Sequence, residues 1–176
     1  MASLNIACPE TTEYGPDFGK YIHLTPEGDV PAFLETQLGE LLGLLGGLSE
    51  SESLVRHPPY TWSIKQVVGH MTDCERIFGY RVLRIARNDA TPLTSFDENT
   101  FMQFADFDRW PLVELAAEFE FVRRSHLQLL RHLDPGAWLR RGVVGGHPMT
   151  VRAMVFVIGG HAKHHLDILH KRLANR

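Results

Sequence analysis

Two histidines near the C-terminal end of the chain are spaced to bind one metal ion. His161 and His165 lie four residues apart within the run His-Ala-Lys-His-His-Leu-Asp-Ile-Leu-His. Four residues of α-helix give a rise of about 6 Å and a rotation of about 40°, so both imidazoles lie on one face. Met154 and Ile158 share this face, which indicates that the histidines point inward. Neutral imidazoles at this spacing can both reach one transition metal.

The same spacing has a second interpretation. The chain contains ten histidines, so a His-x-x-x-His pair also arises by chance. A buried histidine can hydrogen-bond to a backbone carbonyl instead of a metal. A third ligand on a facing helix would favour the metal. His70 and His126 both lie on apolar helical stripes, and the stripes alone do not distinguish between them.

Four stretches with helical apolar periodicity must position these side chains, at about 30–46, 63–88, 111–133 and 151–173. Ser63 and Gln66 resemble a capping box at the start of the second helix, and Thr150 can cap the fourth. The predicted stripe of the third helix is Leu112, Leu115, Phe119, Val122, His126, Leu129 and Leu133. No strand-like alternation accompanies these stretches. The sequence therefore predicts an all-α protein, an antiparallel four-helix bundle with long connecting loops.

The remaining segments divide the chain only weakly. Residues 1–28 are rich in turn formers, and we expect an extended N-terminal segment there, followed by one domain over 29–176. Residues 89–110 mix aromatic and acidic side chains in a connection long enough to have a function. This loop either covers the mouth of a pocket or folds Phe101, Phe104 and Phe107 under the bundle.

Composition excludes several classes of function. The net charge of −3 offers no broad basic surface, so we expect no nucleic-acid partner. No apolar stretch reaches membrane-spanning length and no leader-like segment opens the sequence, which predicts a cytoplasmic protein without a membrane partner. Cys8 and Cys74 form neither a disulfide framework nor a zinc-binding pair. Histidine is therefore the one transition-metal ligand present in quantity.

Two stretches resemble a known family. Trp62-Ser63-Ile64, followed by Val67-Val68-Gly69-His70-Met71-Thr72-Asp73-Cys74-Glu75, resembles a signature of the DinB-like superfamily, and Thr150-Val151-Arg152 with the segment from Gly160 to Ile168 resembles its closing helix. The likeness spans residues 30–173 and is greatest for the YfiT-like branch. It implies a four-helix bundle, often a homodimer, that binds a divalent metal, usually zinc or nickel, through three histidines. By motif position these are His70, His161 and His165, whereas His126 has no counterpart.

The resemblance also implies a choice of reactions on a small molecule. Some members of the family transfer low-molecular-weight thiols such as bacillithiol or mycothiol to electrophiles, and others are described as metal-dependent hydrolases. Hydrolysis requires a carboxylate near the metal. The position that follows His161, where thermolysin-like helices carry glutamate, is Ala162. Asp73 is the nearest candidate for contact with the site, although it can equally pair with Arg76 or Arg123.

We therefore predict a metal-dependent enzyme that transfers a thiol to a small electrophile. A metal-dependent hydrolase and a non-catalytic, metal-dependent binding or sensor module are the alternatives. A charged thiol would need a cation near the pocket, and Arg81, Arg84 and Lys163 are equal candidates. Cys74 is a ligand or a small core residue. Asp167, His164 and His170 lie off the ligand face, and we expect them at the surface.

Overall fold

The computed structural model describes residues 5–174 and is built around four long helices. These are α2 (Val30–Gly46), α4 (Ile64–Ala86), α6 (Leu112–Arg131) and α7 (Val151–Leu173). Each begins and ends within two residues of a helix predicted from apolar periodicity. The predicted all-α four-helix bundle is confirmed. None of the helices in the described part of the chain has the length and apolar character needed to cross a bilayer.

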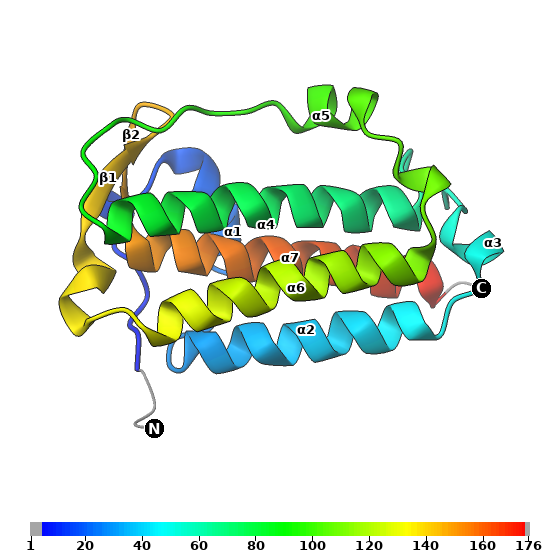
Figure 1. The fold of residues 1–176 in the computed structure, drawn as a ribbon, viewed down its shortest axis with the longest axis horizontal. Helices are drawn as coiled ribbons and strands as arrows, with labels where there is room; N and C mark the ends of the chain where they lie inside the picture. The colour runs from blue at the N-terminus through cyan, green and yellow to red at the C-terminus, as the bar shows by residue number, and fades with distance from the viewer. Residues whose placement is uncertain (1–4, 175–176) are drawn as a thin grey trace.

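The helices do not simply alternate in direction along the chain. Helices α2 and α7 run one way and α4 and α6 the other (Figure 1). The neighbours α4 and α6 are parallel because residues 87–111 return along the length of α4 before α6 begins. This crossover carries α5 (Glu98–Phe104) and a 3-10 helix, η3 (Phe107–Arg109). A single long crossover of this kind is one of the known ways to connect a four-helix bundle.

Side-chain caps fix where the long helices start. Ser63 Oγ accepts a hydrogen bond from the backbone N–H of Gln66 (3.0 Å), and the Gln66 side chain accepts one from the backbone N–H of Ser63 (2.9 Å). The predicted capping box of α4 is therefore present. Asp29 and Thr150 cap α2 and α7 in the same way, each accepting from the backbone N–H three residues later.

Helix α7 is the centre of the fold. Residues 153–162 of α7 are all buried, because α1 (Gly19–Ile22) covers the side that the other long helices leave open. A helix that is covered on every side must be apolar on every side, as this half of α7 is. Gly160 allows the closest approach, since a Cβ at this position would overlap the backbone carbonyl of Tyr21.

The N-terminal segment is folded onto the bundle instead of being extended throughout. Within residues 5–28 it forms η1 (Thr11–Glu13), η2 (Pro16–Phe18) and α1. Glu13 is buried, forms an ion pair with Arg152 and accepts a hydrogen bond from Thr150 Oγ1 (2.7 Å). These contacts hold the segment at the start of α7. Residues 1–4 and 175–176 of the two predicted segments lie outside the described residues, and the domain boundary at residue 28 stays a prediction.

Smaller elements connect the long helices, and the sequence pattern did not predict them. Between α2 and α4 lies α3 (Glu50–Ser53), and η4 (Pro135–Leu139) follows α6. An antiparallel hairpin of β1 (Arg141–Val144) and β2 (His147–Thr150) then leads into α7, with Arg141 opposite Thr150. Its two-residue turn is Gly145-Gly146, both at positive φ, a backbone conformation that glycine adopts at no steric cost.

The predicted buried stripe of α6 is correct only over the first half of the helix. Beyond Phe119 the deeply buried positions are Arg123, Leu127 and Leu130. The predicted positions Val122, His126, Leu129 and Leu133 are half-buried. The physical reason is an ion pair with α4, in which Arg123 is fully enclosed beside Glu75. The pattern of apolar residues cannot predict that a charged residue is buried in the core.

Candidate metal centre

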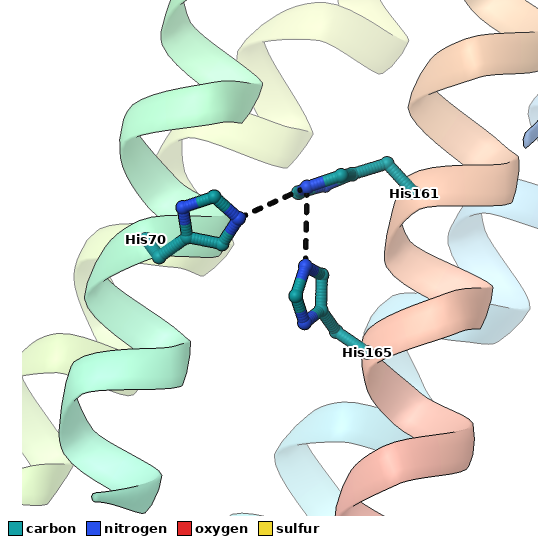
Figure 2. A group of neighbouring side chains, drawn as sticks. All are labelled: His70, His161 and His165. Carbon is teal, nitrogen blue, oxygen red and sulfur yellow. Dashed lines mark hydrogen bonds between the residues drawn. The ribbon is translucent and has the colours of Figure 1, made fainter. Parts of the chain in front are cut away.

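Three histidines from two helices converge in the bundle (Figure 2). His70 comes from α4, and His161 and His165 come from successive turns of α7. The Nε2 atom of His161 lies 3.2 Å from Nε2 of His70 and 3.2 Å from Nε2 of His165. All three side chains are buried, and one ring nitrogen from each lies within 4.8 Å of the others. The three residues are placed together, as the sequence analysis expected.

Hydrogen bonds between the imidazoles do not explain this convergence. A ring nitrogen carries either one hydrogen or one in-plane lone pair, yet Nε2 of His161 faces two other nitrogens. Protonation does not relieve the conflict. Burial lowers the pKa of His70 to about 4 and the pKa values of His161 and His165 well below the ordinary value, and the neighbouring histidines lower the latter two further. Three neutral nitrogen donors therefore face a common point.

The spacing fits a divalent transition metal. Nitrogens bound about 2.0–2.1 Å from a tetrahedral ion lie about 3.3 Å from one another. The two short Nε2···Nε2 distances, both 3.2 Å, match this value. Imidazole donors suit zinc, nickel, copper and iron alike, so the donor set does not select the metal. Three protein ligands also leave at least one coordination position open.

Aromatic rings pack against two of the three histidines, His70 and His161. Trp62 packs against His70 with ring centroids 5.0 Å apart, and Tyr21 and Phe78 pack against His161 at 5.3 and 5.5 Å. Metal-binding histidines usually donate their second N–H to a polar group. Here Nδ1 of His165 is buried without a hydrogen-bond partner among residues 5–174. The rings that pack against His165 are those of His70, His161 and His164, with centroids 4.9, 4.5 and 5.1 Å away.

Cys74 lies beside the three histidines but is not one of the converging ligands. Its Sγ is 3.7 Å from both ring nitrogens of His70. Burial raises the pKa of the Cys74 thiol well above its ordinary value, and the charge of Glu98 raises it further. A protonated thiol is a weak ligand, because the thiolate is the form that binds metals. The prediction that Cys74 is a small core residue suits this position better than the prediction that it is a ligand.

A cavity of about 460 Å³ opens over the histidines. Its walls come from α4, α7, the N-terminal segment and the crossover, which contributes Ser95, Phe96, Glu98 and Asn99. The first part of the 89–110 loop therefore covers the cavity, as one of the two interpretations predicted. Phe107 instead packs on Gly69 of α4, and Phe104 is 88% exposed. A cavity of this size suits a small molecule.

Asp73 lies outside this cavity. Its carboxylate is 3.6 Å from Arg76 Nη1 and lines a separate hollow that also includes Glu118. The predicted contact between Asp73 and the metal site is therefore replaced by an ion pair on the outer side of α4. The carboxylate that sequence reasoning missed is Glu98 of α5, which lines the cavity. Burial lowers the pKa of His70, and the negative charge of Glu98 partly opposes that effect.

The three candidate cations separate clearly in the structure. Arg81 lines the cavity. Arg84 forms an ion pair with Asp89, and Lys163 forms one with Asp167. The helical position of Arg81 was visible in the sequence, but its burial depends on the crossover that packs over it.

The other histidines behave largely as predicted. His126 is hydrogen-bonded to Glu75 (3.1 Å) and does not line the cavity. His170 is exposed and pairs with Glu40 (2.8 Å). His164 is exposed as expected, but it also borders the mouth of the cavity.

A four-helix bundle with one long crossover and a converging set of three histidines defines the class of protein. The chain matches the DinB superfamily over residues 34–169 and belongs to that family. The family resemblance seen in the sequence is confirmed.

One solved structure has the same fold across nearly the whole chain. YfiT from Bacillus subtilis is described as a probable metal-dependent hydrolase with an unusual four-helix bundle topology. It shares 16% sequence identity with this chain, and the match covers 96% of this chain and 94% of YfiT with a TM-score of 0.74. At this identity the likeness shows the fold alone. No curated protein matches the chain significantly.

Proposed function

We propose that the protein is a metal-dependent enzyme in which His70, His161 and His165 hold a divalent ion, zinc or nickel. The observation that carries the proposal is the convergence of three buried imidazoles beneath a cavity, with Nε2 of His161 3.2 Å from Nε2 of each of the other two and all three nitrogens within 4.8 Å of one another. When bound, such an ion acts as a Lewis acid and lowers the pKa of a thiol or water molecule at its open coordination position. A small molecule that enters the cavity is the expected substrate.

We favour transfer of a low-molecular-weight thiol to an electrophile. In this reaction the sulfur forms a bond to an electrophilic carbon, the leaving group departs with its bonding electrons, and the thiol proton passes to solvent. The protein needs only to bind and orient both molecules. Trp62, Phe78 and Phe96 line the cavity and offer apolar surface for an organic electrophile. Among residues 5–174, no carboxylate is hydrogen-bonded to the three histidines, which limits proton abstraction from water.

Hydrolysis is the second candidate, and Glu98 is the observation that favours it. Its carboxylate lines the cavity and is close enough to influence the pKa of His70. A carboxylate in that position can accept a proton from an attacking water molecule, a contribution of about 10²- to 10⁴-fold in rate. The description of YfiT as a probable metal-dependent hydrolase supports the same reaction class.

One set of variants tests the proposal. Purified without chelator, the wild-type protein should hold about one zinc or nickel ion per chain, because a preformed set of neutral ligands favours metal binding. His70→Ala, His161→Ala and His165→Ala should each lose most of it in elemental analysis. His164→Ala is the matched control on α7 and should keep it. Stoichiometric metal in all three ligand variants would contradict the proposal.

Activity measurements on the same proteins separate the reactions. A panel of biological thiols with a fluorogenic alkyl halide should give product that a chelator abolishes and zinc or nickel restores. Glu98→Gln should leave thiol transfer within a few-fold of wild type, whereas it should slow a hydrolase about 10²-fold or more. If the protein binds metal but catalyses neither thiol transfer nor hydrolysis, the proposal of an enzyme is contradicted. A binding or sensor module is then favoured. The homodimer and the cytoplasmic location stay predictions.

A further inference from the structure

Arg81 is buried in the wall of the cavity. It lies on α4 with 3% of its surface exposed. Its guanidinium lies beside two neighbouring rings, 5.5 Å from the centre of Phe96 and 5.9 Å from the centre of Phe78. Nη2 donates a hydrogen bond to the backbone carbonyl of Thr94 (2.7 Å). Within the described residues this is its one hydrogen bond, so Nε and Nη1 have no protein acceptor.

No carboxylate of residues 5–174 lies within ion-pair distance of Arg81. Two other enclosed arginines are compensated, since Arg123 pairs with Glu75 and Arg152 with Glu13. Arg172 also lacks a carboxylate, but it donates to two carbonyls and does not line the cavity. A buried charge without a partner is costly. The position of Arg81 therefore calls for an anion that enters the cavity from outside the protein.

The guanidinium and the three histidines belong to one continuous wall. The Phe78 ring contacts both, with its centre 5.9 Å from the Arg81 guanidinium carbon and 5.5 Å from the ring centre of His161. The Cys74 thiol, which touches His70, lies within electrostatic range of Arg81. Arg81 also borders a second hollow of about 310 Å³, which no carboxylate of the described residues lines.

We propose that Arg81 binds a carboxylate of the substrate while the reacting group of the same molecule occupies the three-histidine site. The proposal rests on the proposed function, since it assumes that this site holds a metal. A guanidinium presents its N–H groups in a planar fork that matches a carboxylate. A dianionic phosphate fits less well, because Glu98 and Asp17 also line the cavity. The substrate class is thus a small carboxylic acid whose apolar stem lies across Phe78.

A matched pair of thiols tests this assignment. The full-length protein is loaded with cobalt, and the thiolate-to-cobalt absorption band is followed during titration with mercaptopropionate or mercaptopropanol. The two thiols have the same reacting group and similar length, but only the first carries a carboxylate. We expect wild type to bind the acid about tenfold more tightly or better, as charge-assisted hydrogen bonds do. Arg81→Gln should bind both thiols equally.

Two further variants exclude simpler explanations. Arg84→Gln removes the same charge one turn along α4 and should keep the wild-type preference. Arg81→Lys keeps the positive charge but lacks the planar N–H groups of the guanidinium, and it should keep part of the preference for the acid. Loss of the hydrogen bond to Thr94 could loosen the crossover. This would weaken the binding of both thiols equally and leave the ratio of their dissociation constants unchanged. An unchanged ratio in Arg81→Gln would overturn the proposal.

The failures of the two proposals are distinguishable. If the cobalt–thiolate band forms in wild type without any preference for the acid, the carboxylate proposal is wrong and the metal site stands. If cobalt does not bind, the proposed function is wrong and the carboxylate proposal falls with it.

Discussion

Two buried polar clusters share α4, one of them against α6 and the other against α7, and they are built in opposite ways. In the first, Glu75 of α4 accepts a hydrogen bond from Arg123 Nη2 (2.9 Å) and one from His126 Nδ1 (3.1 Å), while Arg123 Nε lies 2.6 Å from the same carboxylate. In the second, three imidazoles face one another and nothing of opposite charge lies between them. The charges of the first cluster balance within the protein, although Arg123 Nε has no hydrogen-bond partner among residues 5–174. In the proposed function, a metal ion completes the second cluster.

The pKa values express the same difference. Burial opposes ionisation of Glu75, but Arg123 and His126 outweigh it and hold the pKa of Glu75 below its ordinary value. Around His161 and His165, burial and the neighbouring histidines both lower the pKa and favour neutral rings, and burial outweighs the opposing charge of Glu98 at His70. Opposite charges thus stabilise a buried group in its ionised form. Neighbouring histidines instead favour the neutral form of one another, in which a ring nitrogen keeps a lone pair that can bind a metal. A buried cluster whose charges balance within the protein is typical of a structural role. A buried cluster whose lone pairs have no donor indicates a site for a ligand.

The largest expected effect is on the cluster whose charges balance within the protein. Arg123→Met should lower the free energy of unfolding by about 3–5 kcal/mol, because it leaves the Glu75 carboxylate buried without a cation. Metal content per folded chain should stay at the wild-type value. Urea denaturation followed by circular dichroism measures the first quantity and elemental analysis the second.

A double variant serves as the control for this prediction. Adding Glu75→Leu to Arg123→Met removes both charges and should recover most of the lost stability, since burying neither ion avoids the desolvation cost. If the single variant is as stable as wild type, or if the double variant is the less stable of the two, the comparison between the clusters fails.

The second prediction concerns pH and the three histidines of the metal-free protein. Their folded-state pKa values lie below those of the unfolded chain, and for His70 the folded value is about 4. As pH falls through about 6.5, the three histidines take up protons in the unfolded chain but stay neutral in the folded protein. The free energy of unfolding should therefore fall with decreasing pH, by up to about 1.4 kcal/mol per pH unit for each proton.

Chemical denaturation between pH 7 and pH 5 in the presence of a chelator measures this slope. The acids with lowered pKa values do not contribute in this range, because the stability that they provide is lost only at lower pH; they are Glu13, Glu50, Glu75, Asp89 and Asp97. A variant with leucine in place of all three histidines should lose most of the slope. A wild-type curve as flat as that of the variant would show that the rings are not held neutral by burial.

The smallest effect should come from a single ligand position. His165→Leu removes a buried Nδ1 that has no hydrogen-bond partner in the described structure and replaces it with an apolar side chain. In metal-free protein the free energy of unfolding should stay within about 1 kcal/mol of wild type or rise, as replacement of an unpaired polar group allows. A loss as large as that of Arg123→Met would place His165 in a structural cluster after all.

The sequence was sufficient for the four long helices, because each carries enough apolar periodicity to define its own bounds. It was also sufficient to nominate His161 and His165 from spacing, while His70 needed the family resemblance. Prediction from the sequence failed where the burial of a side chain depends on how a distant element packs against it. Glu98 belongs to the site because the crossover folds back over α4, and no spacing along the chain encodes that approach. The burial of Arg123 likewise depends on Glu75, a partner 48 positions away.

The tight docking of α1 against Gly160 has a consequence for the composition of the cavity wall. It places Phe18 and Tyr21 in the wall of the cavity, although both precede residues 34–169, the part that matches the family. One rim of the cavity is thus supplied by a segment that lies outside the residues matched to the family, and Tyr21 of this segment packs against His161. Substitutions in this segment can therefore reshape the cavity without changing any of the three histidines.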